Sequence, residues 1–368
     1  MAHIEKRGPG RWRARYRDPN GKERSKTFER KVDAERWLTT KAAEMMSGTY
    51  IGPDAGRTTL GTYAAEWLAR MAPTWRVSTA AGITNSLEHH ILPVLGRRPV
   101  PSIRRSDIEA LCAALRLAPS TVATVHQHLG QLLASAVEDG LIARNPAVRA
   151  RLPKREASKA QPVPLDVVER IHAGLPDWMA VAVPIGIGAG LRQGEASGLT
   201  VDRLDFLRRT LRVDRQLLCR HVPAPVLGPP KTESSHRTIP LASFLRDALA
   251  DHLRRHPAGP GELVLRSPAG QPLDADRFGH QWRRACRAAG VPGLRYHDLR
   301  HTFASTLLSR GVSVKAVADW LGHASPTITL ATYAHLMPAD EEVARAVLDD
   351  ALAPPAASPR PTTGTDLA

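Results

Sequence analysis

The chain has 368 residues with an ordinary apolar content, which predicts two or three globular domains. Its formal net charge is +15, and a GC-rich genome alone does not explain this excess, so we expect nucleic acid as the partner. Three scattered cysteines without a CxxC spacing argue against a structural zinc and for a reducing compartment. Without a signal peptide or a bilayer-length apolar run, we expect a cytoplasmic or nucleoid-associated protein.

Residues 11–17 alternate strictly between arginine and apolar side chains, which predicts a strand with one basic and one aromatic face. A turn leads into a second strand over 22–28, where Phe28 has the same parity as two basic residues, so we expect this strand to end or bulge before Phe28. A helix with its apolar stripe over 34–45 follows. We interpret 1–56 as a basic ribbon that enters a DNA groove, in preference to a solvated charged face. The candidate DNA-binding residues are Arg11, Arg13, Arg15, Arg17, Arg24 and Lys26.

A linker rich in Gly and Pro at 49–57 precedes a region of helical spacing over 58–148. Apolar stripes predict four helices there, and they indicate a packed core rather than a ligand site. The expected helices begin near Leu60, Ser78, Ser106 and Ser120. The residues that contact DNA are not evident from the pattern, and the arginines offered only as candidates are Arg76, Arg97, Arg98, Arg104 and Arg105.

After a second linker at 149–163, residues 164–345 predict a mixed α/β domain. A helix near 178–187 is apolar almost all round and should be buried. We expect strands at 211–213 and 237–241, with an edge strand and hairpin turn at 229–235 between them. A short helix at 340–352 and a disordered tail from Pro354 complete the chain, so that 346–368 holds a helix end and the tail. The fold class is therefore multidomain and mainly α, with small β-sheets.

A cluster of chemically active residues lies near the C-terminus. Arg300 and His301 fall within a helix expected over 298–309, and His297 immediately precedes it. His323 and Tyr333 follow in the next segments. Arginine forks suit phosphate oxygens, histidine suits proton transfer near neutral pH, and a tyrosine hydroxyl can be a covalent nucleophile. Together they indicate attack by tyrosine on a phosphodiester.

A zinc site is the alternative for this cluster. His297 and His301 are four residues apart, as the two histidines of an HExxH zinc site are. Here the pattern is H-D-x-x-H, and Arg300 lies between the two histidines. A guanidinium beside a dication is unfavourable, so we expect no metal.

Four sequence pieces resemble the tyrosine recombinase (phage integrase) family: G-L-R-Q-G-E at 190–195, H-D-L-R-H at 297–301, L-G-H at 321–323, and Tyr333. Any one piece is a weak signal, but their order and spacing together are specific. The resemblance covers about 58–345, and the N-terminal segment is similar to the arm-type DNA-binding domain of lambda-integrase-like members. It implies an arm-binding domain (1–56), a helical, SAM-like core-binding domain (58–148) and a catalytic domain (164–345).

The resemblance also implies a role for each site residue. Arg192 and Arg300 would hold the nonbridging oxygens of the scissile phosphate, while Glu195 would orient Arg192 or its neighbours rather than take part in the chemistry. His323 would donate a hydrogen bond to the phosphate, and Tyr333 would be the nucleophile.

Three further assignments follow from the resemblance. His297 would handle the proton at the tyrosine hydroxyl, whereas His301 would be structural. Lys231, in the motif P-K-T, would be the general acid for the 5′-hydroxyl leaving group.

The implied function is site-specific recombination of a mobile element such as a prophage, through a 3′-phosphotyrosyl intermediate. The covalent link conserves the bond energy, so neither ATP nor a metal is expected. The implied partners are core and arm DNA sites, three further copies of the chain in a tetramer on a Holliday junction, a directionality factor and a DNA-bending protein. Two alternatives stay open: a type IB topoisomerase-like enzyme that relaxes supercoils, and a non-catalytic DNA-binding regulator.

Overall fold

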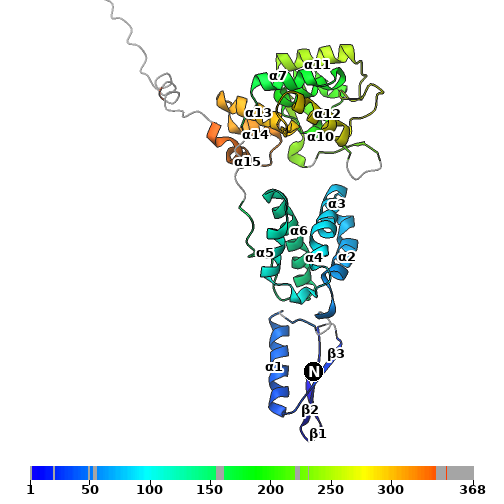
Figure 1. Ribbon diagram of the computed structural model, residues 1–368, viewed down its shortest axis with the longest axis vertical. Coiled ribbons are helices and arrows are strands. Elements are labelled where there is room, and N and C mark those ends of the chain that lie inside the picture. Colours follow the sequence, from blue (N-terminus) through cyan, green and yellow to red (C-terminus); the bar gives the residue numbers. More distant parts are fainter. Residues whose placement is uncertain are drawn as a thin grey trace, which may run out of the picture. The chain divides into compact units, whose positions relative to one another are not determined.

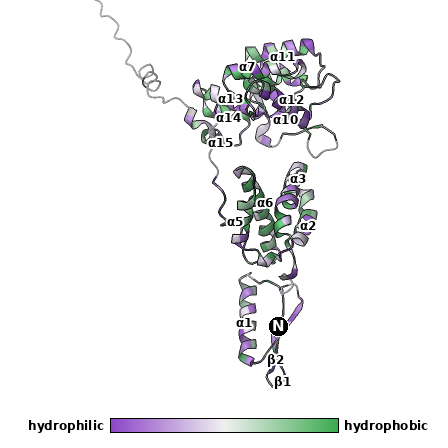
Figure 2. Cartoon of the chain, in the orientation of Figure 1, coloured by the Kyte–Doolittle hydropathy of each residue, from purple (hydrophilic) through white to green (hydrophobic). Residues whose placement is uncertain are grey.

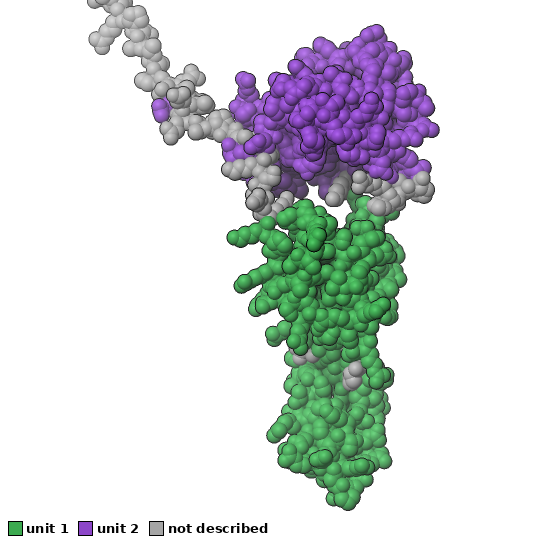
Figure 3. Space-filling view, in the orientation of Figure 1, with its two compact units in different colours: residues 1–157 green, residues 158–368 purple. Residues whose placement is uncertain are grey.

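The computed structural model describes residues 2–19, 21–48, 50–52, 56–154, 161–219, 224–230, 232–336 and 345. The chain forms two compact units, Met1–Ala157 and Ser158–Ala368, which Figure 3 shows in different colours. Each unit is described by itself below. None of the helices in the described ranges combines the length and the apolar character that crossing a membrane requires.

A three-stranded antiparallel sheet begins the first unit, in the order β1 (His3–Gly8), β2 (Arg11–Arg17), β3 (Glu23–Phe28). Helix α1 (Lys31–Met46) covers one face of it (Figure 1). On that face the Tyr16 ring lies 5.2 Å from the Trp37 ring, centroid to centroid. The predicted alternation of β2 is confirmed, because Ala14 and Tyr16 are buried whereas the arginines lie on the opposite face. Strand β1 was not predicted.

The second strand differs from its prediction. β3 continues through Phe28 in unbroken register, so the expected early end or bulge was wrong. Tyr16 pairs with Arg24 and Ala14 pairs with Lys26, and directly paired residues share a face of the sheet. Arg24 and Lys26 therefore lie on the aromatic face, opposite the β2 arginines. The parity conflict disappears because Phe28 lies on the apolar side, where it packs against Trp37.

The rest of the first unit is helical, as predicted. Its helices are α2 (Leu60–Met71), α3 (Val77–Ser86), α4 (Leu92–Leu95), α5 (Arg105–Ala114) and α6 (Pro119–Glu138). A π-helical turn, Leu87–Ile91, joins α3 to α4. The stripes of α2 and α6 meet in one hydrophobic core, and Figure 2 shows α6 as largely hydrophobic. Trp67 lies in this core and donates a hydrogen bond from its indole nitrogen to Ser135, which satisfies its polar atom.

The second unit places helices around a second hydrophobic core. Its helices are α7 (Leu165–Gly174), α8 (Asp177–Ala180), α9 (Ala182–Ala189), α10 (Gln193–Ser197), α11 (Ser243–Arg255), α12 (Ala275–Ala288), α13 (Tyr296–Ser309), α14 (Val314–Leu321) and α15 (Pro326–Tyr333). Helix α9 is buried almost all round, as its composition predicts, and it packs against α13 and α11. Helix α13 begins two residues before the predicted start.

The strands of this unit form two small antiparallel sheets. One has the order β4 (Leu204–Asp205), β5 (Thr210–Val213), β8 (Arg237–Pro240), which confirms the two predicted strands. The other pairs β6 (Gln216–Leu218) with β7 (Val226–Gly228). The edge strand expected at 229–235 was wrong: the strand ends at Gly228, and Glu233–Ser235 form a 3-10 turn. Lys231, most of the helix expected at 340–352 and the tail from Pro354 lie outside the described residues.

Candidate active site

One cavity of about 430 Å³ in the second unit collects the predicted catalytic side chains. It lies where the start of α10, the first turns of α13, the loop after α14 and the end of α15 converge. Of the six predicted residues, five line it: Arg192, His297, Arg300, His323 and Tyr333. The sixth, Lys231, lies outside the described residues, but Thr232 and Ser234 from its segment line the cavity.

Arg300 is fixed from both sides by backbone carbonyls. Its side chain is buried, with 2% of the residue exposed. One terminal nitrogen donates to the Gly190 carbonyl at 2.7 Å, and the other donates to the Leu321 carbonyl. Burial lowers the pKa of this guanidinium and Arg192 lowers it further, yet it remains charged at neutral pH. A buried arginine that still lines a cavity is suited to bind an anion there.

Arg192 lies just before α10 and is held by Glu195, one turn along. Its backbone N–H donates to Glu195 Oε2 at 2.9 Å, and its Nη1 donates to Oε1 at 2.8 Å. The Glu195 side chain is 3% exposed and also receives two bonds from Arg237. Burial by itself would raise the pKa of Glu195, but Arg237 and then Arg192 outweigh it and hold this pKa at about 2. The expectation that Glu195 orients Arg192 agrees with these contacts.

Tyr333 is 2% exposed, and its hydroxyl is hydrogen-bonded to His301 Nδ1 at 2.6 Å. Burial raises the pKa of this tyrosine to about 12, although Arg300 partly opposes the increase. The phenol is therefore neutral at pH 7 and needs a base to become a nucleophile. Sequence analysis gave His301 a structural role and placed His297 at this hydroxyl. Within the described contacts, the hydroxyl has His301 as its partner.

His297 and His323 are both neutral at pH 7. Burial is the main reason that the pKa of each falls to about 4, and the positive charge of Arg300 adds to it. His323 is oriented by a hydrogen bond between its Nδ1 and Thr329 Oγ1, at 2.8 Å. The His297 ring lies edge-on to the His301 ring, with 4.9 Å between centroids. Binding of a phosphate anion would raise both pKa values again.

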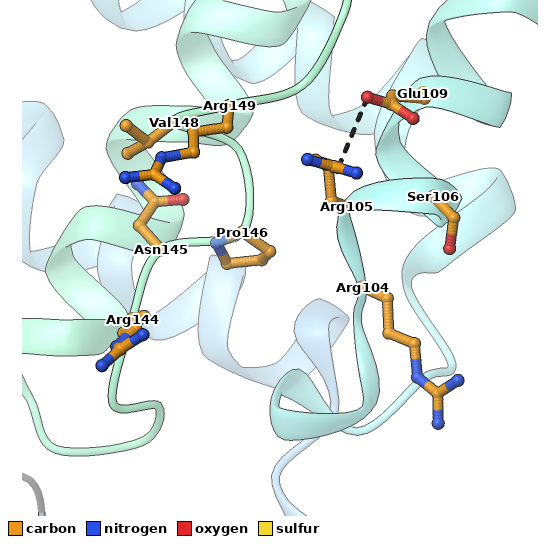
Figure 4. A pocket seen from close by; sticks show the side chains of 9 residues that line it. All are labelled: Arg104, Arg105, Ser106, Glu109, Arg144, Asn145, Pro146, Val148 and Arg149. Atoms are coloured by element: carbon orange, nitrogen blue, oxygen red, sulfur yellow. Dashed lines mark ion pairs between the residues drawn. The ribbon is translucent and has the colours of Figure 1, made fainter.

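A second feature is a basic groove of about 850 Å³ in the first unit. Arg104 and Arg105, at the start of α5, line one side, and Arg144 and Arg149 line the other (Figure 4). Arg105 faces Glu109 at 3.6 Å, the one ion pair between the residues drawn there. Two of the arginines that sequence analysis offered as DNA-binding candidates thus belong to this groove.

The β2 arginines form a second basic surface. Arg11 and Arg17 are exposed, and Arg13 donates to Ser25 on the neighbouring strand. Arg15 is the most restrained, because it pairs with Glu5 and Glu23. On the other face, Arg24 pairs with the buried Asp18 at 2.9 Å, and Lys26 lies over the Phe28 ring.

Three profiles of one protein family match nearly the whole chain. The profile described as phage integrase family matches residues 164–340, the phage integrase central domain matches 60–152, and the phage integrase N-terminal domain matches 3–47.

Similar proteins carry related names. The integrase of the Mycobacterium tuberculosis prophage phiRv2 is 29% identical over 340 residues, covering 88% of this chain and 89% of its own. The integrase of Mycobacterium phage D29 is 28% identical, covering 91% and 93%. A tyrosine recombinase XerC-like protein of Caldanaerobacter subterraneus is 27% identical, covering 91% and 94%.

Solved structures share the fold. The integrase of the Tn1549 transposon, in complex with transposon right end DNA, gives a TM-score of 0.69 at 24% identity and covers 80% of this chain and 99% of its own. A lambda integrase tetramer bound to a Holliday junction gives a TM-score of 0.59 at 20% identity, covering 90% and 94%. The chain therefore belongs to the phage integrase family. It is a site-specific DNA recombinase of the tyrosine type.

Proposed function

We propose that Tyr333 is the nucleophile of the recombinase. Its hydroxyl oxygen attacks the scissile phosphorus, the new bond is a 3′-phosphotyrosyl ester, and the phosphorus–O5′ bond breaks. One proton leaves the phenol and one is delivered to the 5′-oxygen, so the step consumes neither a nucleotide nor a redox partner. The reverse attack, by the 5′-hydroxyl of the partner strand, completes strand exchange. The observation that carries this assignment is the meeting of a buried tyrosine with two arginines in one cavity.

His301 is the base in this proposal. Its Nδ1 is 2.6 Å from the hydroxyl, within the range for direct proton transfer. Burial lowers the pKa of His301, so the ring is neutral and can accept a proton at pH 7. His297, beside it, would orient His301 or stabilise its charged form.

Arg192, Arg300 and His323 form the phosphate site in this proposal. Two guanidinium groups oppose the negative charge that grows in a five-coordinate transition state, and His323 adds a hydrogen bond. Both arginines are held by bonds that do not involve substrate, so little reorganisation is needed when the phosphate arrives. Lys231 would protonate the 5′-oxygen.

DNA contacts are proposed for the basic groove and the exposed face of β2. Their arginines suit the sugar–phosphate backbone. We infer the arrangement of an arm-binding domain at 1–56, a core-binding domain at 58–148 and a catalytic domain at 164–345. A homotetramer on DNA is supported by the lambda integrase tetramer, whose fold this chain shares. A directionality factor, a DNA-bending protein and a nucleoid location are further inferences from the resemblance.

The test is the variant Tyr333→Phe with a nicked suicide substrate. It should bind core-site DNA and leave no protein on the 3′ end, because the nucleophilic oxygen is missing. A covalent adduct formed by this variant would show that the nucleophile is another residue. Strand exchange between two sites by the unaltered protein would distinguish recombination from topoisomerase-like relaxation. A covalent adduct formed by the unaltered protein would exclude a non-catalytic regulator.

A further inference from the structure

A buried arginine outside the sequence motifs links the segments of the active site. Arg237 lies at the start of β8, with 4% of its side chain exposed. Its Nε donates to the Trp320 carbonyl at 2.6 Å, and its Nη1 donates to the Ser235 carbonyl at 3.0 Å. Both terminal nitrogens also bond the Glu195 carboxylate, at 3.1 and 2.8 Å. Such complete pairing of a buried arginine is costly to disturb.

Each partner of Arg237 belongs to a segment that carries a proposed catalytic residue. Glu195 holds Arg192 by two bonds. Trp320 is three residues before His323, in the last turn of α14. Ser235 ends the 3-10 turn Glu233–Ser235, which follows Lys231 in the sequence. Arg237 is thus the common neighbour of three segments that are far apart in the sequence.

The charges explain why this neighbour is an arginine. Glu195 is buried beside Arg192, and its carboxylate would compete with a scissile phosphate for that guanidinium. Because Arg237 forms a bidentate pair with the same carboxylate, the Glu195 charge is already neutralised. Arg192, whose side chain is 37% exposed at the cavity, keeps its charge available for an incoming anion.

We propose that Arg237 is a positioning residue for strand cleavage. It neutralises Glu195 and holds the Trp320 carbonyl, so that Arg192 and His323 are aimed at the scissile phosphate. It does not itself touch DNA. This inference rests on the proposed function, since it assigns Arg192 and His323 to the phosphate.

The test measures adduct formation by Arg237→Lys and Arg237→Gln on a nicked suicide substrate. Lysine keeps a charge but cannot form the bidentate pair. Cleavage should fall about 10²-fold, as for misplaced catalytic groups, while core-site binding stays close to that of the unaltered protein. The matched control is Arg203→Lys, since Arg203 is also part-buried and pairs with two aspartates, Asp202 and Asp214. The control should cleave normally.

A second substrate distinguishes positioning from a general folding defect. A methylphosphonate at the scissile position replaces a nonbridging oxygen by methyl and removes the charge that Arg192 opposes. On it, the defect of Arg237→Lys relative to the unaltered protein should shrink by roughly tenfold or more, because less transition-state charge needs stabilising. An equal defect on both substrates would overturn the inference. Selective recovery on a 5′-sulfur substrate would also overturn it, because Arg237 would then act on the leaving group.

The double variant Arg237→Gln with Glu195→Gln gives an independent measurement. It should cleave faster than Arg237→Gln alone, because no carboxylate then competes for Arg192. A double variant as slow as the single one contradicts the charge argument. Normal cleavage by Arg237→Lys would refute this inference and leave the proposed function intact. Failure of the unaltered protein to form any adduct would instead refute the proposed function.

Discussion

At the scale of single residues, our proposal depends on which group removes the phenolic proton. Tyr333 is a weak acid with a pKa of about 12, so a base must act during attack. His301 contacts the hydroxyl, whereas the described contact of His297 in the site is with the His301 ring. The two histidines therefore act in series in our proposal, with His301 nearer the nucleophile.

His301→Gln tests this order. Glutamine can keep a hydrogen bond to the hydroxyl but cannot take its proton, so cleavage should slow by about 10²–10⁴-fold. In the unaltered protein the rate should hold as the pH falls to the ordinary histidine pKa of 6.5 and should drop only at a lower pH, since burial lowers the pKa of His301 and only its protonated form cannot act as a base. In the variant, the rate should instead rise steadily with pH, because hydroxide must remove the phenolic proton.

The matched control for this prediction is His256→Gln, which alters a histidine paired with Asp177 outside the cavity. It should retain both the rate and the pH profile. Should His301→Gln behave in the same way, His301 is structural, as the family resemblance implied.

The proposed role of Lys231 as general acid is tested by changing the leaving group of the DNA substrate. Lys231→Ala should cleave ordinary DNA slowly, because an alkoxide leaves poorly without a proton donor. A substrate with sulfur in place of the bridging 5′-oxygen releases a thiolate, which needs no proton because thiol pKa values lie near about 8.5. Its cleavage by Lys231→Ala should approach the normal rate, while Arg300→Ala stays defective on both substrates. Absence of this selective rescue would assign Lys231 to phosphate binding or to structure.

At the scale of elements, the ends of helices position the site. Helix α14 ends at Leu321. Gly322 follows with a φ of 66°, and the chain turns there to present His323. A Cβ at this glycine would lie 3.0 Å from the Ser234 carbonyl oxygen and 3.1 Å from Ser235 Cα. The turn therefore requires glycine at position 322, both for its backbone conformation and for its close contact with Ser234 and Ser235.

Gly322→Ala should therefore impair cleavage more than DNA binding. The left-handed conformation costs an alanine about 1–2 kcal/mol, and the close contact adds to this cost. We expect a lower thermal unfolding midpoint and a clear loss of adduct formation, since His323 shifts. Gly311→Ala is the control: it also has a positive φ, of 79°, but its Cβ would meet nothing within 4 Å. Both variants should lose stability, but only Gly322→Ala should also form less adduct. Equal cleavage by the two variants would show that the turn at Gly322 does not position His323.

How much the sequence predicted depends on the range of the interactions. Helix α6 was predictable because Val122, Val125 and Leu129 repeat with helical spacing. The β6–β7 hairpin was not, since strands of three residues carry too little alternation. The motif residues of the site were visible as a pattern. The His301–Tyr333 bond was not, because it depends on how α15 packs against α13.

Arg237 illustrates the same limit. No local signal connects residue 237 with Glu195 or Trp320, so its role emerges only from tertiary contacts. The parity of β3 could have been resolved, however. Taking the aromatic side chain rather than the basic ones as the mark of the inner face would have placed Phe28 correctly.

At the scale of the whole molecule, the chain has two separate hydrophobic cores and an N-terminal sheet that packs on its own helix. The buried core of the first unit is built from residues 60–147, and among the described residues of 1–56 none belongs to it. The sheet and α1 form their own contacts instead, through Tyr16, Phe28 and Trp37. Removal of the N-terminal segment should therefore leave both cores intact.

Deletion of residues 1–56 should abolish binding to arm sites while cleavage at core sites survives. A finer comparison uses the two faces of the sheet. Replacing Arg11 and Arg17 by Gln alters the exposed basic face, whereas Lys26→Gln alters the aromatic face, where Lys26 lies over the Phe28 ring. If both arginines contact phosphates, the slope of log K against log salt should weaken by about 1.8, since each phosphate contact contributes roughly 0.9. Lys26→Gln should leave the slope nearly unchanged. A larger effect from Lys26→Gln would show that the sheet meets DNA through its aromatic face. For the deletion, equal loss of arm-site and core-site binding would contradict a separate role for residues 1–56.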